Sequence, residues 1–600
     1  METWKTNLDE TKKRYIDWWN HKGIILNMWE HFQEGVKPHA DIPAPSPAKD
    51  LNQKWFDPQW RAEYLDWYVA HSSLKADILP VANTQLGPGS LAAILGGVFE
   101  GGEDTIWIHP DPDFNDEIVF NPEHPNWILH KELLKACKAK ANGHYYVGMP
   151  DLMEGLDVLA ALKGTDKVLL DTVMQPEVLE QQMQQINDIY FKVFDELYDI
   201  IREGDEMAFC YFSSWAPGKM SKLQSDISTM ISEDDYRRFV QPFIREQCQK
   251  IDYTLYHLDG VGAMHHLPAL LEIEELNAIQ WTPGVGEPQG GSPKWYDLYK
   301  KILAGGKSIM ACWVTLDELK PLLDNIGADG VHLEMDFHNE REVEQAMRIV
   351  EEYSSSSSDV SKEDLLKEEA AATKQETIVV KDSAAAGNEA LKPLFNAIVD
   401  GKLEPAIEVT KKAIAEGVQP QKIINNYMIK AMGEVGQRFQ DGKAFVPQLL
   451  MAGRAMKGAL ELLKPLLQGS ASTTIGKVVI GTVKGDLHDI GKNLVASMLE
   501  GCGFEVINIG IDVSCDKFVE EVKKNKADIL CMSALLTTTM TYMQEVINAL
   551  EAAGIRHQVK VMIGGAPVSQ GFADEIGADG YSDNANTAVA VAKELMGLHK

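Results

Sequence analysis

The chain has 600 residues, 45% of them hydrophobic and 24% charged, which excludes wholesale disorder and predicts about three or four folded domains. A formal charge of −32 disfavours nucleic acid and anionic membrane surfaces as partners. The seven cysteines lack regular spacing, no apolar run approaches the roughly 20 residues that span a bilayer, and the first residues are unlike a secretion signal, so we expect a cytoplasmic protein with reduced thiols.

The first 352 residues alternate short apolar segments with longer helical patterns. The expected strands are Gly23–Met28, Ala76–Val81, His144–Gly148, Ala208–Phe212, Thr254–Leu258, Ala278–Trp281, Ser308–Trp313 and Gly330–Met335. Helical patterns such as Pro176–Glu203 and Asp234–Lys250 lie between most of them. This alternation predicts a TIM (β/α)8 barrel with insertions, in which the functional side chains lie at the C-terminal ends of the strands.

A change of composition follows this region. Ser354–Ser358 are five consecutive serines, and acidic and alanine-rich residues continue to about Lys374. Such a segment buries too little apolar surface to offset the entropy of ordering it, so we expect a flexible linker over residues 353–385. All 13 tryptophans lie at or before Trp313, which indicates that the cores on the two sides of the linker differ.

The remaining residues predict two further domains. Residues 386–470 show no strand pattern, and their expected helices are Leu391–Asp400, Glu404–Ala415, Pro420–Phe439 and Pro447–Leu467. They predict a four-helix bundle. In residues 471–600 the expected strands are Lys477–Thr482, Glu505–Ile509, Ile529–Ser533, Lys560–Ile563 and Gly580–Tyr581. With helices between them, these strands predict a Rossmann-like, doubly wound α/β domain.

Short motifs fall at three strand ends of this last domain. They are Asp486-Leu-His488-Asp-Ile-Gly491, Ser533-Ala-Leu535 and Gly564-Gly565. Open α/β sheets bind ligands at this edge. His488 can offer a neutral nitrogen to a metal, Asp486 can hold the other ring nitrogen, and paired glycines let a large group approach the backbone. The alternative is that Asp486 and His488 are a capping pair at the start of a helix.

These motifs resemble those of the cobalamin-binding proteins. The preceding helices resemble the cap of methyl-carrying corrinoid proteins in Met432–Gly436, Phe439 and Phe445–Met451. The resemblance implies a cobalamin with His488 as the lower cobalt ligand, and with Asp486 and Ser533 completing a ligand relay. It also implies that the nucleotide tail of the cofactor passes Ser533 and Gly564, and that the helices cover the reactive face. The helices could instead be a structural spacer.

The first domain resembles the uroporphyrinogen decarboxylase superfamily, which includes methyltransferases that work with corrinoid proteins. The segments that carry this resemblance are Met149–Gly164, Leu223–Asp226, Ser232–Pro242 and Trp281–Gly286. Decarboxylases of the superfamily have an arginine-rich loop near the N-terminus, but the corresponding residues 81–90 contain no basic side chain. The net charge also disfavours a polyanionic substrate, so a decarboxylase with an appended cobalamin domain is the weaker alternative.

Methyltransferases of this superfamily use a zinc site of His-x-Cys with a later cysteine. Here the first part is His257-Leu-Asp259, whose members share one face of a strand, and Cys312 and Glu334 end later strands. We therefore expect a zinc site of His257, Asp259 and Cys312, to which Glu334 could add a fourth group. A carboxylate in place of a thiolate favours activation of an ether oxygen over that of a thiol. The alternative is a hydrogen-bonded pair beside a packed thiol.

Aromatic residues also gather near the expected strand ends. Tyr211, Trp215, Trp281 and Trp313 would belong to the barrel core or the wall of the pocket, or would form a cage for a quaternary ammonium group.

These features together predict a corrinoid-dependent methyltransferase. It would move a methyl group between a small methylated ether, amine or thioether in the barrel and the cobalt of a bound cobalamin. Transfer from methyl-cobalamin to a thiol or folate acceptor stays open, as does a non-catalytic corrinoid carrier or sensor. We expect a second methyltransferase or a methyl acceptor as a partner. A reductive activator protein is also expected, because the chain has no iron–sulfur cysteine spacing.

Overall fold

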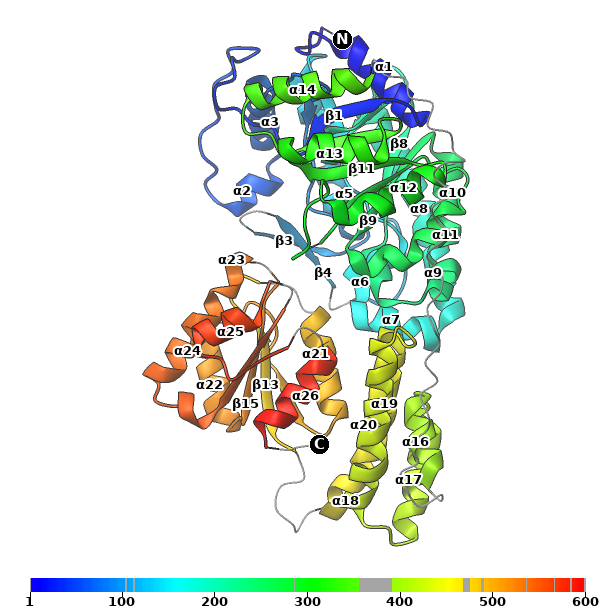
Figure 1. Cartoon of the computed structure of the whole chain (residues 1–600), viewed down its shortest axis with the longest axis vertical. Helices are drawn as coiled ribbons and strands as arrows, with labels where there is room; N and C mark the ends of the chain where they lie inside the picture. The colour runs from blue at the N-terminus through cyan, green and yellow to red at the C-terminus, as the bar shows by residue number, and fades with distance from the viewer. Residues whose placement is uncertain are drawn as a thin grey trace. The chain divides into compact units, whose positions relative to one another are not determined.

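The computed structural model describes residues 2–102, 105–111, 114–284, 286–354, 391–467, 475–486, 490–535, 537–565, 567–582 and 585–597. The chain divides into two compact units, Met1–Thr377 and Ile378–Lys600 (Figure 1). The expected linker over residues 353–385 lies almost entirely outside the described residues. Within the described part of the chain, every helix is too short or too polar to cross a membrane.

The first unit is built on two sheets whose strands are parallel except for β7, which pairs with β6 in antiparallel orientation. The larger sheet has the order β1-β12-β11-β10-β9-β8, and the smaller has the order β2-β5-β6-β7. The larger sheet contains β1 (Ile24–Met28), β8 (Met220–Gln224), β9 (Tyr253–Asp259), β10 (Ala278–Thr282), β11 (Ser308–Val314) and β12 (Val331–Met335). The smaller sheet contains β2 (Val81–Ala82), β5 (Tyr146–Met149), β6 (Met207–Phe209) and β7 (Trp215–Ala216). Because β6 lies against β8, the two sheets adjoin.

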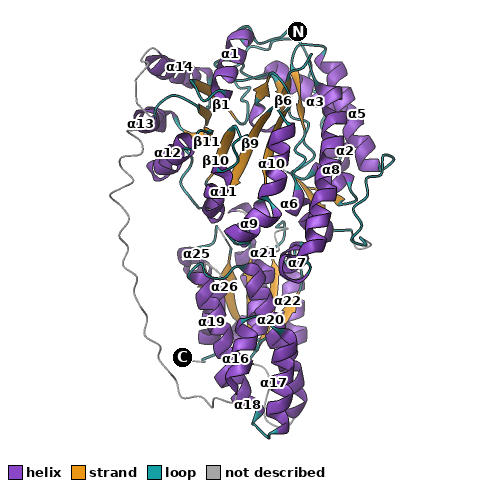
Figure 2. Cartoon of the chain, turned by 90° about the vertical axis from the view of Figure 1, so that its right-hand side faces the viewer, coloured by secondary structure: helices purple, strands orange, loops and turns teal. Residues whose placement is uncertain are grey.

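Helices surround these strands (Figure 2). They are α1 (Leu8–Trp19), α2 (Leu51–Phe56), α3 (Pro58–His71), α4 (Ser90–Ile94), α5 (Pro125–Ala141), α6 (Gly155–Lys163), α7 (Thr165–Met174), α8 (Pro176–Ile201), α9 (Glu233–Phe239), α10 (Gln241–Lys250), α11 (Leu267–Leu271), α12 (Tyr296–Ala304), α13 (Leu316–Ile326) and α14 (Glu340–Ser354). In α8 the buried residues Leu179, Met183, Ile186 and Tyr190 recur at helical spacing, which gives the helix one apolar face. A capping box of Thr315 and Glu318 starts α13.

Three features of the first unit differ from the prediction. The strand expected at Ala76–Val81 is reduced to β2, because the Lys5 ammonium donates to the carbonyl oxygens of Leu74 and Ala76 at 2.9 and 2.8 Å and Ala76 has a positive φ of 50°. Strand β8 was not predicted, since lysine and glutamine interrupt its apolar pattern. The antiparallel hairpin of β3 (Val98–Gly101) and β4 (Ile106–His109) was also missed.

The second unit begins with helices α16 (Lys392–Val399), α17 (Leu403–Ala415), α18 (Pro420–Ile423), α19 (Ile429–Gln440) and α20 (Val446–Leu463). A π-helical turn, Ile424–Met428, joins α18 to α19. Helix α17 packs on α16 and α20, and a Cβ at Gly458 would lie only 2.4 Å from the Leu403 side chain. A larger residue at this position would require the Leu403 side chain to move.

A parallel sheet with the order β14-β13-β15-β16-β17 completes the second unit. The strands are β13 (Lys477–Thr482), β14 (Glu505–Asn508), β15 (Ile529–Ser533), β16 (Lys560–Gly564) and β17 (Gly580–Ser582). The helices are α21 (Ile490–Gly501), α22 (Cys515–Asn525), α23 (Thr537–Met540), α24 (Tyr542–Ala552), α25 (Gln570–Ile576) and α26 (Ala585–Leu595). This arrangement confirms the predicted Rossmann-like domain, whose ligand edge lies where the strand order reverses, at β13 and β15.

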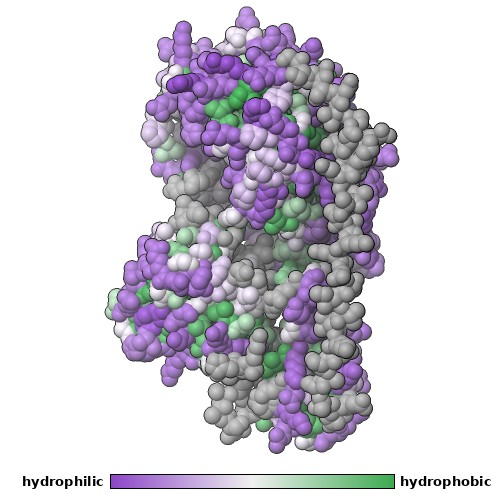
Figure 3. All heavy atoms as spheres, in the orientation of Figure 1, coloured by the Kyte–Doolittle hydropathy of each residue, from purple (hydrophilic) through white to green (hydrophobic). Residues whose placement is uncertain are grey.

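The two faces of this sheet belong to different cores. Val478 and Ile480 pack with residues of the preceding helices, whereas Val479 packs on the opposite side with residues of α22 and α24. On the face shown in Figure 3, hydrophilic residues cover most of the described surface of both units.

Candidate functional site

In the second unit, the predicted motif residues lie at one edge of the sheet. Thr482, Ser533, Gly564 and Ser582 are consecutive partners across β13, β15, β16 and β17. Ser533 and Gly564 are therefore neighbours at the C-terminal strand ends, as predicted. Gly491 lies in the first turn of α21, and a Cβ there would meet open space.

Asp486 joins two loops at this edge. Its side chain is fully buried, and its Oδ2 accepts hydrogen bonds from the backbone N–H of Leu535 at 2.7 Å and from the Thr539 hydroxyl at 2.6 Å. Hydrogen bonds to a carboxylate are among the strong ones in proteins, so Asp486 ties the loop after β13 to the segment after β15. His488, the expected cobalt ligand, lies outside the described residues.

Thr539 is a site residue that sequence reasoning missed. Ser533 was predicted to complete the relay with Asp486, and this stays a prediction; the structure adds a hydrogen bond to Asp486 from the hydroxyl of Thr539, six residues later. Thr539 is one of three consecutive threonines, so the sequence does not single it out.

The paired glycines leave a stretch of backbone without side chains. Gly565 has a φ of +130°, and a Cβ there would lie 1.8 Å from the carbonyl oxygen of Ala534. A Cβ at Gly564 would lie 2.9 Å from the carbonyl oxygen of Ser582. No other residue fits at Gly565, because the backbone at Ala534 approaches it too closely for a side chain.

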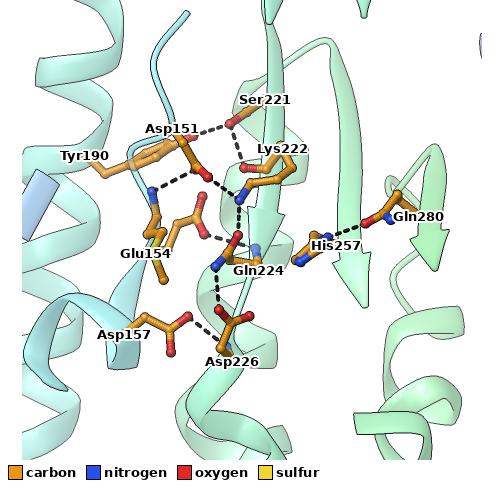
Figure 4. Close-up of polar contacts among 11 residues, drawn as sticks. Asp151, Glu154, Asp157, Tyr190, Ser221, Lys222, Gln224, Asp226, His257 and Gln280 are labelled. Carbon is orange, nitrogen blue, oxygen red and sulfur yellow. Dashed lines mark hydrogen bonds and ion pairs between the residues drawn. The ribbon is translucent and has the colours of Figure 1, made fainter. Parts of the chain in front are cut away.

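In the first unit, polar side chains occupy alternate positions on neighbouring strands. Gln224, His257 and Gln280 are direct partners across β8, β9 and β10. Alternate residues of a strand share a face, so Asp259, two positions after His257, lies on the face that His257 occupies. The sheet thus carries a row of polar groups at its C-terminal end, part of which is drawn in Figure 4.

Three side chains of this row approach one another closely enough to hold a metal ion. One ligand atom each from Asp226, His257 and Asp259 lies within 4.8 Å of the other two. The sequence predicted His257 and Asp259 as a pair, and the structure adds Asp226 from the 3-10 turn that follows β8 (Asp226–Met230). Asp226 was missed because β8, which positions it, was not recognised as a strand.

Cys312 and Glu334 do not join this group. Among the described residues, the single group of three or more His, Cys, Asp or Glu side chains that comes this close contains neither of them. Cys312 is fully buried, and its sulfur accepts a hydrogen bond from Gln280 Nε2 at 2.9 Å. Glu334 is also fully buried, accepts from Asn27 Nδ2 at 3.2 Å and lies 2.8 Å from His332 Nε2. Burial raises the pKa of both Cys312 and Glu334.

A chain of polar contacts runs beside the Asp226 group (Figure 4). The buried Lys222 ammonium donates to Asp151 Oδ2 at 2.6 Å and contacts Gln224 Oε1. Gln224 donates from Nε2 to Asp226 Oδ2 at 3.0 Å and from its backbone N–H to Glu154 Oε2 at 3.1 Å. One lysine thus faces several carboxylates, and Asp226 is coupled through Gln224 to that lysine.

The titration of these groups follows from burial. Desolvation raises the pKa of Asp157 to about 6 and raises the pKa of Glu154 and Asp226 well above their usual range. Desolvation also lowers the pKa of His257 to about 3, with the Lys222 charge as a smaller cause. His257 is therefore neutral near pH 7 and keeps a lone pair that can bind a metal.

The aromatic residues divide into two groups. Trp215 and Trp281 are fully buried, which fits the alternative that they belong to the core. Trp313 instead stacks on Trp29 with centroids 5.2 Å apart, and Phe212 lies edge-on to Trp29 at 4.6 Å. Phe212 and Trp313 have positive φ angles of 58° and 54°, a strained conformation for such residues that favours a functional role for this wall.

Comparison with known proteins shows to which family the second unit is similar. Residues 476–590 and residues 390–464 each match a family of B12 binding domains. The dimethylamine corrinoid protein 1 of Methanosarcina acetivorans is 47% identical over 209 residues, covering 35% of this chain and 98% of the relative. The trimethylamine corrinoid protein 2 of Methanosarcina mazei is 44% identical over 214 residues, covering 35% of this chain and 98% of the relative.

Two solved structures are also similar over about a third of the chain. A cobalamin-binding protein from Desulfitobacterium hafniense is 36% identical, covering 34% of this chain and 98% of that chain, with a TM-score of 0.30. The methanol:cobalamin methyltransferase complex MtaBC from Methanosarcina barkeri is 31% identical, covering 36% and 82%, with a TM-score of 0.32.

The second unit is thus a B12-binding module made of a helical segment and a Rossmann-like domain. The chain belongs, through this unit, to the family of B12-binding corrinoid proteins. The relatives are matched over nearly their whole length, and they cover about a third of this chain.

Proposed function

We propose that the chain is a corrinoid-dependent methyltransferase whose first unit binds a small methylated compound and whose second unit holds a cobalamin. Membership of the corrinoid protein family supports the second half of this proposal. The observation that carries the first half is the Asp226, His257 and Asp259 group at the C-terminal ends of parallel strands. A carrier alone would need no such group.

The second unit fits a cobalamin at the edge formed by β13, β15 and β16. His488 would bind the cobalt, with Asp486 and Thr539 supporting the loop that contains it. The other groups at the edge are Gly491, Ser533, Leu535, Gly564 and Gly565. Gly565 allows the segments that follow β15 and β16 to pack closely at this edge. When bound, a corrinoid supplies a cobalt atom that accepts and releases a methyl group.

For the first unit we propose a closed TIM (β/α)8 barrel of the uroporphyrinogen decarboxylase type. Support comes from the repeated alternation of parallel strands and helices and from the contact of β6 with β8, which brings the two sheets together. In such barrels the chemistry takes place where the Asp226 group lies. The helices α16 to α20 would form the four-helix cap of the cobalamin domain.

At the Asp226 group we propose a divalent metal, with zinc as the first candidate. One imidazole and two carboxylates are a donor set that catalytic zinc accepts, and they leave a position for substrate. The metal would offset the negative charge of these two carboxylates. It would also polarise the oxygen, nitrogen or sulfur atom that gives up the methyl group. Cys312 and Glu334 would then stabilise the surroundings of the site and would not bind the metal.

Further components are proposed from the chemistry. A methyl group that enters the chain must leave it, so we propose a second methyltransferase or an acceptor as a partner. The described cysteines are all free, and six of the seven are buried, so a separate reductive activator is also proposed.

The visible spectrum of the full chain with reduced cobalamin tests this function. A methoxyaromatic, a methylamine and a methyl thioether are added separately, and one of them should change the corrinoid spectrum. The Asp259→Ala variant should bind cobalamin with an unaltered spectrum yet lose that change. A change of equal rate in Asp259→Ala would show that the first unit does not activate the substrate.

A further inference from the structure

Gln280 is a fully buried amide that lies directly behind His257. The pairing of β9 with β10 sets Gln280 opposite His257, and Gln280 Oε1 contacts His257 Nδ1. Figure 4 shows Gln280 on the side of His257 away from Lys222 and Gln224. The amide nitrogen of Gln280 donates to Thr282 Oγ1 at 2.7 Å and to the Cys312 sulfur at 2.9 Å.

These contacts determine which nitrogen of the His257 imidazole carries the proton. An amide oxygen only accepts hydrogen bonds, so the nitrogen that contacts it must carry the ring proton. A neutral imidazole has one such proton, so Nε2 then keeps its lone pair. In this orientation the Gln280 nitrogen donates to the Thr282 hydroxyl and to the Cys312 sulfur, whereas with the amide reversed these two groups would have to donate to the amide oxygen.

We propose that Gln280 is a positioning residue that holds His257 with the proton on Nδ1 and presents Nε2 to a divalent cation bound with Asp226 and Asp259. Cys312 then serves to orient the Gln280 amide and is not a ligand. The role toward a cation rests on the proposed function, whereas the tautomer of His257 does not. With the amide reversed, its nitrogen would donate to Nδ1 and the ring proton would lie on Nε2.

The tautomer is tested without any metal, by solid-state 15N NMR of the full chain labelled on histidine. The His257 signals are those lost in His257→Gln. We expect an Nδ1-protonated ring in the wild type and in Gln280→Glu, which keeps an acceptor at this position. In Gln280→Leu the ring should shift toward the Nε2-protonated form. An Nε2-protonated ring in the wild type, or no shift in Gln280→Leu, would overturn the proposal.

Zinc binding by the full chain, measured by competition with a chelator, tests the consequence. Gln280→Leu should weaken binding roughly 10–100-fold, the usual effect of removing a partner of a ligating histidine, and Gln280→Glu should restore most of it. Gln247→Leu is the matched control, since Gln247 is an equally buried amide that bonds to Asn187 elsewhere in the unit. Equal weakening in Gln280→Glu and Gln280→Leu would contradict a positioning role. A wild-type chain that binds no zinc, with the Nδ1 tautomer present, would instead reject the proposed metal and leave the role of Gln280 toward His257 intact.

Discussion

At the scale of single residues, Asp486 illustrates how a buried charge is used in this chain. Its carboxylate is fully buried and accepts one backbone and one hydroxyl hydrogen bond from the same segment. Such a group is costly to bury unless it is hydrogen-bonded, so both donors stabilise the segment that ends at Asp486.

Replacing Thr539 tests this arrangement. Thr539→Val keeps the shape of the side chain but removes the hydroxyl, leaving Asp486 Oδ2 with the Leu535 N–H. Hydrogen bonds to charged groups contribute about 1.5–3 kcal/mol, so we expect cobalamin affinity to fall by roughly tenfold or more. Cobalamin titration of the full chain measures this. Thr410→Val is the control, because the buried Thr410 hydroxyl bonds only to the Ala406 carbonyl of its own helix. Equal affinities for all three proteins would show that Thr539 does not support the cofactor loop.

The proposed metal site of the first unit offers a second contrast between residues. The sequence pointed to Cys312 as a ligand, whereas the structure brings Asp226 to His257 and Asp259. Asp226→Asn should therefore weaken zinc binding strongly, by at least roughly 10–100-fold, because it removes a ligand charge, and Cys312→Ser should change it only a few-fold. Metal content after dialysis against a chelator distinguishes the two variants. Loss of metal in Cys312→Ser with retention in Asp226→Asn would restore the original prediction.

At the scale of secondary-structure elements, the ends of β15 and β16 approach so closely that only glycine fits between them. A Cβ at Gly565 would overlap the Ala534 carbonyl oxygen at 1.8 Å. Gly565→Ala must therefore move the backbone of one strand end, and we expect it to destabilise the second unit and to abolish cobalamin binding. Gly571→Ala is the control, since a Cβ there meets its nearest neighbour at 3.8 Å within helix α25, where alanine stabilises by roughly 0.5–1 kcal/mol. Urea unfolding of the full chain, followed together with cobalamin titration, measures both effects. Normal cofactor binding by Gly565→Ala would be evidence against this edge as the site.

The strands differ in how well the sequence predicted them. Strands β13 to β17 matched expectation to within a residue or so, because each is a short apolar run bounded by turn residues. Strand β8 escaped because it contains Lys222 and Gln224, whose polar groups are buried against Asp151 and Asp226. The periodicity of apolar residues cannot detect a strand such as β8, because this strand buries the charge of Lys222 by pairing it with Asp151. The sequence analysis did not identify Asp226 and Thr539 for a related reason: their partners are distant in sequence and are brought close only by the fold.

At the scale of the whole molecule, two units of different composition share one chain. The B12-binding module is shown by its family and by its strand-edge geometry, and the first unit carries the Asp226 group that the proposed chemistry needs. The proposed reaction therefore requires both units. A methylated compound held by the first unit should transfer its methyl group to the corrinoid of the second.

Isotope transfer within the full chain tests this claim most directly. The protein is loaded with cobalamin, reduced, and given methylated ethers, amines and thioethers that carry a labelled methyl carbon, and the label on the protein-bound corrinoid is then counted. We predict that one compound class transfers its label stoichiometrically to the corrinoid of the wild type. The Asp259→Ala chain should hold the same amount of cobalamin but receive no label. Label arriving equally fast in Asp259→Ala, or from no compound while the corrinoid stays reduced, would contradict the account.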